Sequence, residues 1–219
     1  MNDSDAGSAR VKEIIVAARE LFSNQGYQQT SMRNVVQKAG TSIGNLYFYF
    51  SNKAELLKAV VEHVLDQVWE HIEAEIRDIP YGARQLAVST RILVNYICSN
   101  QKLAQLILVE SSMSGVKTEL LQKHLINEQK LLAVNTSELG ALDSYLAALA
   151  WQGSMVYIIE HIVSDKAHRN IEDMIDFGLD WNLRALGFSQ EVVDDAISYS
   201  RGKVSLSDDL LKRMKNRHD

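Results

Sequence analysis

Residues 30–53 of this chain read TSMRNVVQKAGTSIGNLYFYFSNK. Apolar side chains recur at helical spacing over 32–39, and Gly40 then supplies the positive φ that often ends a helix. A second short helix follows, and Ser31 and Ser42 are placed to cap the first and the second helix. Two short helices joined by a tight turn predict a helix-turn-helix, whose second helix lies in a DNA groove.

This stretch resembles the DNA-binding domain of the TetR family of bacterial transcriptional regulators, and the resemblance covers residues 10–60. It implies an all-α fold with an N-terminal three-helix domain joined to a larger helical domain that binds a ligand and forms a dimer. It also implies a repressor that a small molecule releases from its operator. The residues that carry the resemblance, in one register, are Ala17, Ala18, Leu21, Phe22, Gly26, Tyr27, Thr30, Gly40, Gly44, Leu46, Tyr47, Tyr49, Phe50, Asn52, Lys53, Leu56 and Leu57.

The composition of the whole chain also predicts an all-helical protein. Its 219 residues include a single proline, Pro80, and few runs of alternating β-branched residues. We expect a helix-turn-helix domain over 9–55, a ligand-binding and dimerisation domain over 56–200, and a short amphipathic tail over 201–219. Outside the motif, the expected helices are 9–24, 52–79, 82–99, 101–113, 117–134, 141–163, 170–186, 189–199 and 206–216.

The formal net charge of −5 argues at first against a nucleic-acid partner. Residues 1–60, however, hold seven Lys and Arg against five Asp and Glu, a net charge of +2, which leaves −7 for the remainder. The basic end of the chain therefore carries the motif. Because the excess is small, DNA affinity has to come from placed contacts and from two copies per complex.

Two kinds of side chain are expected to touch DNA. Arg33, near the start of the first motif helix, can present two donors to a guanine edge, although a solvated surface arginine is the alternative. Lys53 is suited to a phosphate, as are several hydroxyls. Ile43 and Phe48 either touch thymine methyl groups or pack against their own domain. The complete set of expected DNA contacts is Thr30, Ser31, Arg33, Ser42, Ile43, Gly44, Asn45, Tyr47, Phe48, Tyr49 and Lys53.

The segment 139–163 is apolar on all sides, with full charges only at Asp143 and Glu160. It is too short and too polar for a membrane span, which needs about 20 apolar residues. A helix that is apolar all round has to be buried all round, either in the core or against a second protomer. The resemblance implies a homodimer through 141–163 and 170–186. Small residues that permit close approach there are Ala147, Ala150, Gly153 and Ser154.

The second domain carries large aromatic and methionine side chains at positions that face inward. In the resembled family this domain encloses a small-molecule pocket, and we expect a largely apolar effector. The alternative is that these side chains are plain core, and that the chain is a constitutive DNA-binding adaptor whose helical domain recruits a partner protein. The candidate pocket residues are Trp69, Tyr96, Glu110, Met113, His124, Trp151, Met155 and Tyr157.

Metal binding, catalysis and secretion have no sequence signal. The histidines and carboxylates do not form a ligand pair on one helical face, and no nucleophile elbow, phosphate loop or dinucleotide fingerprint is present. The lone cysteine, Cys98, excludes an internal disulfide, and residues 1–10 lack the apolar core of a secretion signal. We therefore expect a cytoplasmic protein with no cofactor and no enzymatic activity.

Overall fold

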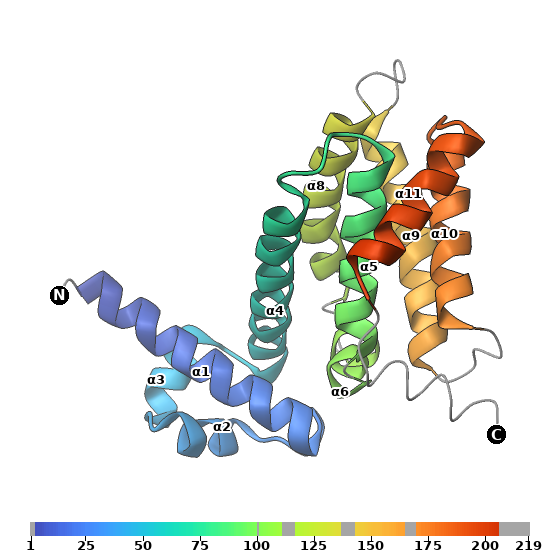
Figure 1. Ribbon diagram of the computed structural model, residues 1–219. Helices are drawn as coiled ribbons and strands as arrows, with labels where there is room; N and C mark the ends of the chain where they lie inside the picture. Colours follow the sequence, from blue (N-terminus) through green and yellow to red (C-terminus); the bar gives the residue numbers. More distant parts are fainter. Residues whose placement is uncertain (1–2, 100, 111–116, 137–142, 165–169, 206–219) are drawn as a thin grey trace. The chain divides into compact units, whose positions relative to one another are not determined.

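A computed structural model describes residues 3–99, 101–110, 117–136, 143–164 and 170–205, and within them every regular element is a helix (Figure 1). This confirms the all-α prediction. In chain order the elements are α1 (Asp3–Gln25), α2 (Met32–Ala39), α3 (Ile43–Tyr49), α4 (Lys53–Ile76), α5 (Ala83–Ser99), α6 (Gln101–Gln105), the π-helix η1 (Leu106–Glu110), α8 (Lys117–Asn135), α9 (Ser144–Val163), α10 (Ile171–Ala185) and α11 (Gln190–Lys203).

Several helix bounds differ from those expected. Helix α1 begins at Asp3 rather than at residue 9, and α11 extends to Lys203 rather than to residue 199. The predicted helix 101–113 is divided into α6 and the π-helix η1. The long helix α4 ends at Ile76, because the buried amide of Gln85 donates hydrogen bonds to the carbonyls of Ile76 (3.0 Å) and Ile79 (2.6 Å) and so satisfies groups that the helix end leaves free. The predicted tail helix over 206–216 lies outside the described residues.

The chain forms two compact units. The first comprises Met1–Gln67 with Lys102–Leu120, and the second comprises Val68–Gln101 with Leu121–Asp219. The first unit therefore extends beyond the expected domain 9–55, and the continuous helix α4 passes from one unit into the other.

The first unit buries apolar side chains from each of its first three helices. Ile14 of α1, Val35 of α2 and Leu46 of α3 are fully buried. Phe22 meets Tyr27 edge to face, with ring centroids 5.2 Å apart, and this contact closes the loop after α1. Val35 and Leu46 therefore anchor the two motif helices in the core of the first unit.

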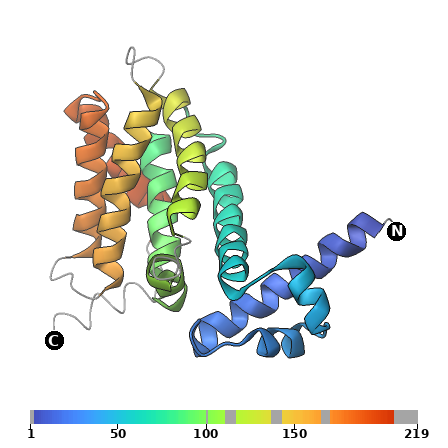
Figure 2. The same cartoon turned by 180° about the vertical axis from the view of Figure 1, so that it is seen from behind.

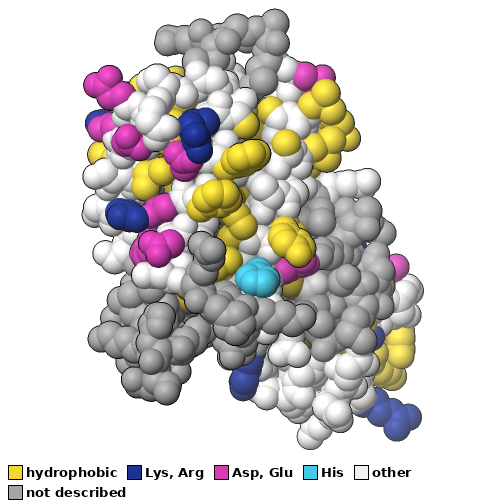
Figure 3. All heavy atoms as spheres, turned by 90° about the vertical axis from the view of Figure 1, so that its right-hand side faces the viewer, with side chains coloured by type: hydrophobic (Ala, Val, Ile, Leu, Met, Phe, Trp, Pro, Cys, Tyr) yellow, Lys and Arg dark blue, Asp and Glu magenta, His cyan; other side chains and the backbone are white. Residues whose placement is uncertain are grey.

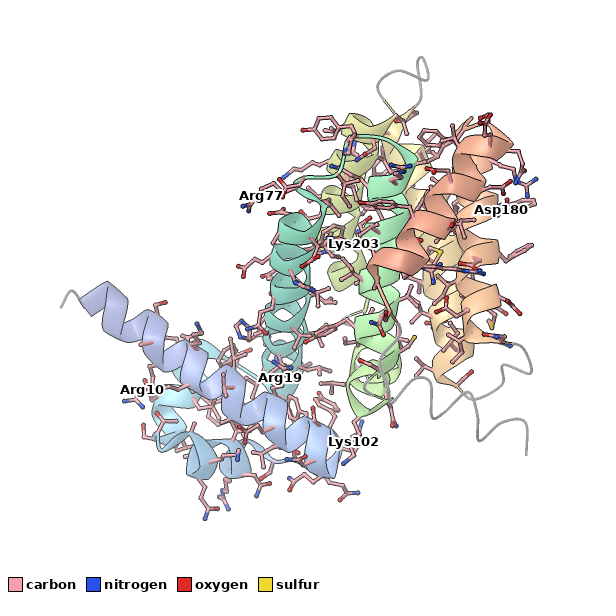
Figure 4. The ribbon with its side chains drawn as sticks, viewed as in Figure 1. Arg10, Arg19, Arg77, Lys102, Asp180 and Lys203 are labelled. Atoms are coloured by element: carbon pink, nitrogen blue, oxygen red, sulfur yellow. The ribbon has the colours of Figure 1, made fainter. Side chains whose placement is uncertain are left out.

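In the second unit, α4 and α5 share an apolar cluster that includes Trp69, Ile72, Ile76, Val88 and Ile92. Beside it, α9 lies between α8 and α10 (Figure 2). The end of α11 lies beside α4, where Lys203 Nζ is 3.6 Å from Glu75 Oε2. Lys203 is labelled in Figure 4.

One buried charge joins three helices of this unit. Arg91 of α5 has no exposed surface, and its guanidinium pairs with Glu172 and Asp176 of α10. Its Nε donates to Ser200 Oγ of α11 at 3.1 Å, and Arg201 also pairs with Asp176. Since a buried charge is stable only when it is paired and hydrogen-bonded, these contacts hold α5, α10 and α11 together.

The pair α9 and α10 is packed closely at Gly178. A Cβ added there would lie 2.7 Å from Ile158 Cδ1 and 3.0 Å from Met155 Sδ, so a larger residue would require these side chains to shift. Asn182 Nδ2 donates to Ser154 Oγ at 2.8 Å, which adds a polar link between the same two helices. The two helices therefore present a fixed joint surface to their surroundings.

Helix α9 is also long and apolar enough, by length and composition, to cross a membrane. Its mean hydropathy is 1.3, and 33% of the apolar window is buried within the chain. One such helix is weak evidence for a membrane span, because core and interface helices of globular proteins have the same composition.

Candidate functional site

The predicted caps of both motif helices are confirmed. At the start of α2, Asn34 N donates to Ser31 Oγ at 3.2 Å and Ser31 N donates to Asn34 Oδ1 at 2.8 Å, which is a reciprocal capping box. Gly40 has φ 61°, and at the start of α3 Asn45 N donates to Ser42 Oγ at 3.1 Å. These caps fix both helices without help from DNA.

Helix α3 presents an uncharged outer face. Ile43, Gly44, Tyr47 and Phe48 are exposed, and Phe48 has 78% of its surface accessible. Of the two alternatives for Ile43 and Phe48, the exposed positions favour contact with DNA over packing in the domain. Nothing lies within 4 Å of a Cβ added at Gly44, so this glycine leaves the backbone open to an approaching groove.

Three of the expected contacts are turned into the protein instead. Thr30 is 1% exposed, and its hydroxyl donates to the Gly26 carbonyl at 2.8 Å, so the prediction that it contacts a phosphate is corrected. Asn45 Nδ2 donates to Thr41 Oγ1 at 2.8 Å and braces the turn. Tyr49 is half-buried, and its hydroxyl lies 3.5 Å from the position that a Cβ at Gly7 would take.

The ammonium group of Lys53 is hydrogen-bonded to backbone carbonyls of its own domain. Its Nζ donates to the carbonyls of Tyr27 (2.8 Å), Thr30 (3.0 Å) and Gln28 (3.5 Å), and it lies 4.2 Å from the centre of the Tyr27 ring. A phosphate contact, as predicted, would have to replace these bonds. The lysine therefore holds the loop between α1 and α2 against the start of α4.

We expect Lys53→Met to lower the free energy of unfolding by about 1–3 kcal/mol, because it removes charge-assisted hydrogen bonds from several carbonyls. Lys12→Met, at an exposed lysine of α1, is the matched control and should change it by less than about 0.5 kcal/mol. Urea denaturation measures both. Unchanged stability of Lys53→Met, with a lower salt dependence of DNA binding, would restore the phosphate role.

Arg33 is exposed on α2, and the described residues give its guanidinium no hydrogen-bond or ion-pair partner. Arg33→Ala should therefore leave stability unchanged and reduce the preference for a specific duplex over a scrambled one, since base readout is worth about 1–3 kcal/mol per bidentate contact. Fluorescence anisotropy on both duplexes measures this, with Arg77→Ala, at an exposed arginine in the turn after α4, as the control. Equal losses on the two duplexes would show that Arg33 contacts only the backbone.

A second surface, here called the α9–α10 face, is apolar and exposed. Figure 3 shows apolar side chains gathered in the middle of the side of the molecule that carries α10, with charged groups mainly along one edge. Phe177 and Trp181 stack on α10 with ring centroids 6.4 Å apart. The large exposed apolar side chains of the two helices are Tyr145, Leu146, Leu149, Tyr157, Phe177 and Trp181.

Of the small residues expected at a dimer interface, some are exposed and one is bonded within its own chain. Ala150 and Gly153 are exposed, and nothing lies within 4 Å of a Cβ added at Gly153. Ala147 is half-buried. Ser154 is used within its own chain, where it accepts from Asn182, and the residue that lets α9 approach α10 is Gly178, which the sequence did not single out.

The second unit also contains a cavity between α4, α5, α8 and α9. It encloses about 10 Å³, the space of about one water molecule. One carboxylate, that of Glu128 in α8, lies among mainly apolar side chains. The lining residues are Trp69, Leu86, Ser89, Thr90, Leu93, Glu128, Leu131, Leu132 and Trp151.

The cavity contains two of the eight candidate pocket residues, Trp69 and Trp151. Tyr157 is 72% exposed on the α9–α10 face, so the prediction that it lines a pocket is corrected. Met155 packs against Gly178 of α10, and Tyr96 packs against the α4–α5 cluster. Three further candidates have side chains outside the described part of the chain: Glu110, Met113 and His124.

Within the described ranges, no group of three His, Cys, Asp or Glu side chains is placed to hold a metal ion. Cys98 is buried, and as the single cysteine of the sequence it forms no internal disulfide.

Known proteins share both the motif and the fold. The profile of the bacterial regulatory proteins of the tetR family matches residues 14–60. YfiR of Bacillus subtilis (strain 168), an uncharacterized HTH-type transcriptional regulator, is 31% identical over 91 residues, which cover 36% of this chain and 44% of YfiR. The matched segment therefore spans less than half of that relative.

Solved structures resemble this chain over most of its length. RolR in complex with resorcinol aligns with a TM-score of 0.71 and 20% identity, covering 93% of this chain and 100% of RolR. The transcriptional regulator FadR from Bacillus subtilis, in complex with stearoyl-CoA, aligns with a TM-score of 0.64 and 20% identity, covering 78% and 97% of the two chains. At this level of identity, the likeness concerns the fold.

The capped motif helices, the exposed face of α3 and the helical second unit define a helix-turn-helix DNA-binding protein. Residues 14–60 therefore carry the DNA-binding domain of the TetR family of bacterial regulatory proteins, and the chain as a whole has the fold of RolR and FadR.

Proposed function

We propose that this protein is a dimeric repressor of transcription that leaves its operator when a small, largely apolar ligand binds the second unit. The observation that carries the proposal is the exposed outer face of α3, held ready by caps at Ser31 and Ser42. Ile43, Tyr47 and Phe48 are exposed together on this short helix, and a group of exposed apolar side chains often marks an interaction site. Such a protein acts in the cytoplasm, where the operator is.

The α9–α10 face supports the dimer. Its stacked aromatic residues Phe177 and Trp181, together with the exposed Tyr157, form an apolar surface that a second copy would cover. Two copies double the number of DNA contacts, which compensates for the small positive charge of each motif domain. Two-fold symmetry would place the motif helices on half-sites about one DNA turn apart.

The ligand response is supported by the cavity and by two proteins of the same fold. RolR was solved with resorcinol and FadR with stearoyl-CoA, so this fold accommodates small molecules of different size. In this chain the cavity of about 10 Å³ is nearly closed, and a ligand therefore binds only a conformation in which the lining has moved apart. A ligand shifts an equilibrium through such a difference in affinity between two conformations.

Mass spectrometry of small molecules released from the purified protein, followed by their addition to operator complexes, tests the proposal. We expect at least one compound to lower DNA affinity, and operator DNA to lower its affinity by the same factor. A protein that binds its operator equally well with every released compound would favour the constitutive adaptor.

A further inference from the structure

Among the described residues that line the cavity of the second unit, Glu128 is the one acidic side chain. It lies on α8, and no described residue gives its carboxyl group a hydrogen bond or an ion pair. The hydroxyl of Ser89 is directed elsewhere, since it donates to the Leu86 carbonyl at 3.0 Å. A carboxyl group enclosed without a partner is unfavourable, and such groups usually serve a function.

The surroundings of Glu128 explain its protonation state. Burial raises the pKa of Glu128 to about 8, although part of the residue's surface stays accessible. No other titratable side chain of α4, α5, α8 or α9 lines the cavity within the described residues. The carboxyl is therefore mostly neutral near pH 7 when the cavity is empty, and it lacks the positive partner that would keep it ionised.

Two indole rings line the same small cavity. Trp69 comes from α4 and Trp151 from α9, so they enter from different helices. The faces of indole rings attract cations, most strongly when water is excluded. Aromatic rings beside an unpaired carboxylate are the combination that recognises an organic cation, whereas an apolar ligand needs no carboxylate.

We propose that this cavity binds the positively charged head group of an organic amine or quaternary ammonium compound, with Glu128 as its counter-ion and Trp69 and Trp151 as its aromatic contacts. The inference rests on the proposed function, because it names the chemical class of the effector. The head group exceeds the present volume, so it selects the conformation with an opened lining.

The proposal predicts the direction in which cation affinity changes with pH. A cation pairs with the ionised carboxylate, so the proton on Glu128 has to leave when the cation binds. Cation affinity should then fall about tenfold for each pH unit below the pKa of about 8, and level off above it. A neutral ligand shows no such fall, because it has no need of the ionised form.

Isothermal titration calorimetry without DNA tests this with two probes of nearly equal shape, benzyltrimethylammonium and its neutral carbon analogue 2,2-dimethylpropylbenzene. Neither probe titrates, so any pH dependence belongs to the protein. For the cation we expect affinity to fall roughly 30-fold from pH 9 to pH 6.5, with release of about 0.9 proton at pH 7, and no change for the neutral probe.

Glu128→Gln should lower cation affinity about 100-fold at pH 9, because it removes the partner of a desolvated charge, and should spare the neutral probe. Glu73→Gln, at an exposed carboxylate of α4, is the matched control and should change neither. Trp151→Leu should reduce the preference for the cation roughly fivefold. The pH titration uses the unaltered protein and so does not depend on the folding of any variant.

Equal affinity for both probes, or cation binding that ignores pH and Glu128→Gln, would overturn the inference, as would failure of the cation to bind. Operator binding is then measured separately. Glu128-dependent cation binding with no effect on the operator complex would support the inference and contradict the proposed function. Release of the operator by the neutral probe alone would contradict the inference and support the proposed function.

Discussion

Gly153→Glu should convert the protein to a monomer and lower its operator affinity by at least about 100-fold. Gly153 is exposed on α9, with nothing within 4 Å of an added Cβ, so the new side chain has space within its own chain. In a dimer through the α9–α10 face it would place two unpaired carboxylates in an apolar interface, where each lacks a partner. A monomer also loses the avidity of binding two half-sites at once, which raises affinity by roughly 10²–10⁴-fold.

Gly202→Glu provides the matched control for this variant. Gly202 is an exposed glycine of α11 that likewise has nothing within 4 Å of an added Cβ, so the same change is made at a helical glycine away from the α9–α10 face. Analytical ultracentrifugation and anisotropy on the operator duplex measure both variants. A Gly153→Glu protein that remains dimeric and binds DNA normally would show that the dimer uses another surface.

Arg91→Ala should destabilise the second unit by about 3–5 kcal/mol, because it leaves the carboxylates of Glu172 and Asp176 without their buried partner. Burial lowers the pKa of Arg91, and the attraction of Glu172 opposes this shift, which shows that the guanidinium depends on its acidic partners. The loss approaches the whole stability of many domains, so the variant should melt far below the unaltered protein.

The comparison is Arg84→Ala on the same helix. Arg84 also forms two hydrogen bonds to a carboxylate, with Nε at 2.6 Å and Nη2 at 2.8 Å from Asp195, but both partners are exposed. Exposed ion pairs contribute little because water already stabilises each charge. Thermal melts followed by circular dichroism should separate the two variants clearly, and similar melting temperatures would contradict the structural role of the buried cluster.

The local features of the motif could be predicted from the sequence. The caps at Ser31 and Ser42 and the helix end at Gly40 depend on side chains and dihedral angles within a few residues, and the structure has all three. The all-helical class followed from the periodicity of apolar residues in the same way. Local chemistry of this kind needs no knowledge of tertiary contacts.

Side-chain direction was harder to predict. Lys53 and Thr30 lie close to the motif and are polar, which made them candidates for phosphate contacts, yet their partners are carbonyls of the loop after α1. Tyr157 was placed in a pocket because it is aromatic, but an apolar helix has two faces, and its face is exposed. Such choices depend on packing between helices that lie far apart in the sequence.

Glu128 shows what composition alone conceals. In the sequence it is one of two acidic residues in a helix of mixed polar and apolar residues, and 28 Asp and Glu residues make no single one conspicuous. Only the meeting of α8 with α4, α5 and α9 encloses it beside two tryptophans. Charged residues at helix positions usually face solvent, so the sequence favoured Glu110 and His124 as the polar groups of a pocket instead.

Selection of bound duplexes from a random DNA pool tests the central claim, that this chain is a dimeric sequence-specific DNA-binding regulator. The account predicts enrichment of a two-fold symmetric sequence whose half-sites lie about one helical turn apart or slightly more. Selection with the Gly153→Glu variant should not enrich a symmetric sequence. A pool that shows no enriched sequence, or a single site without symmetry that Gly153→Glu selects equally well, would contradict it.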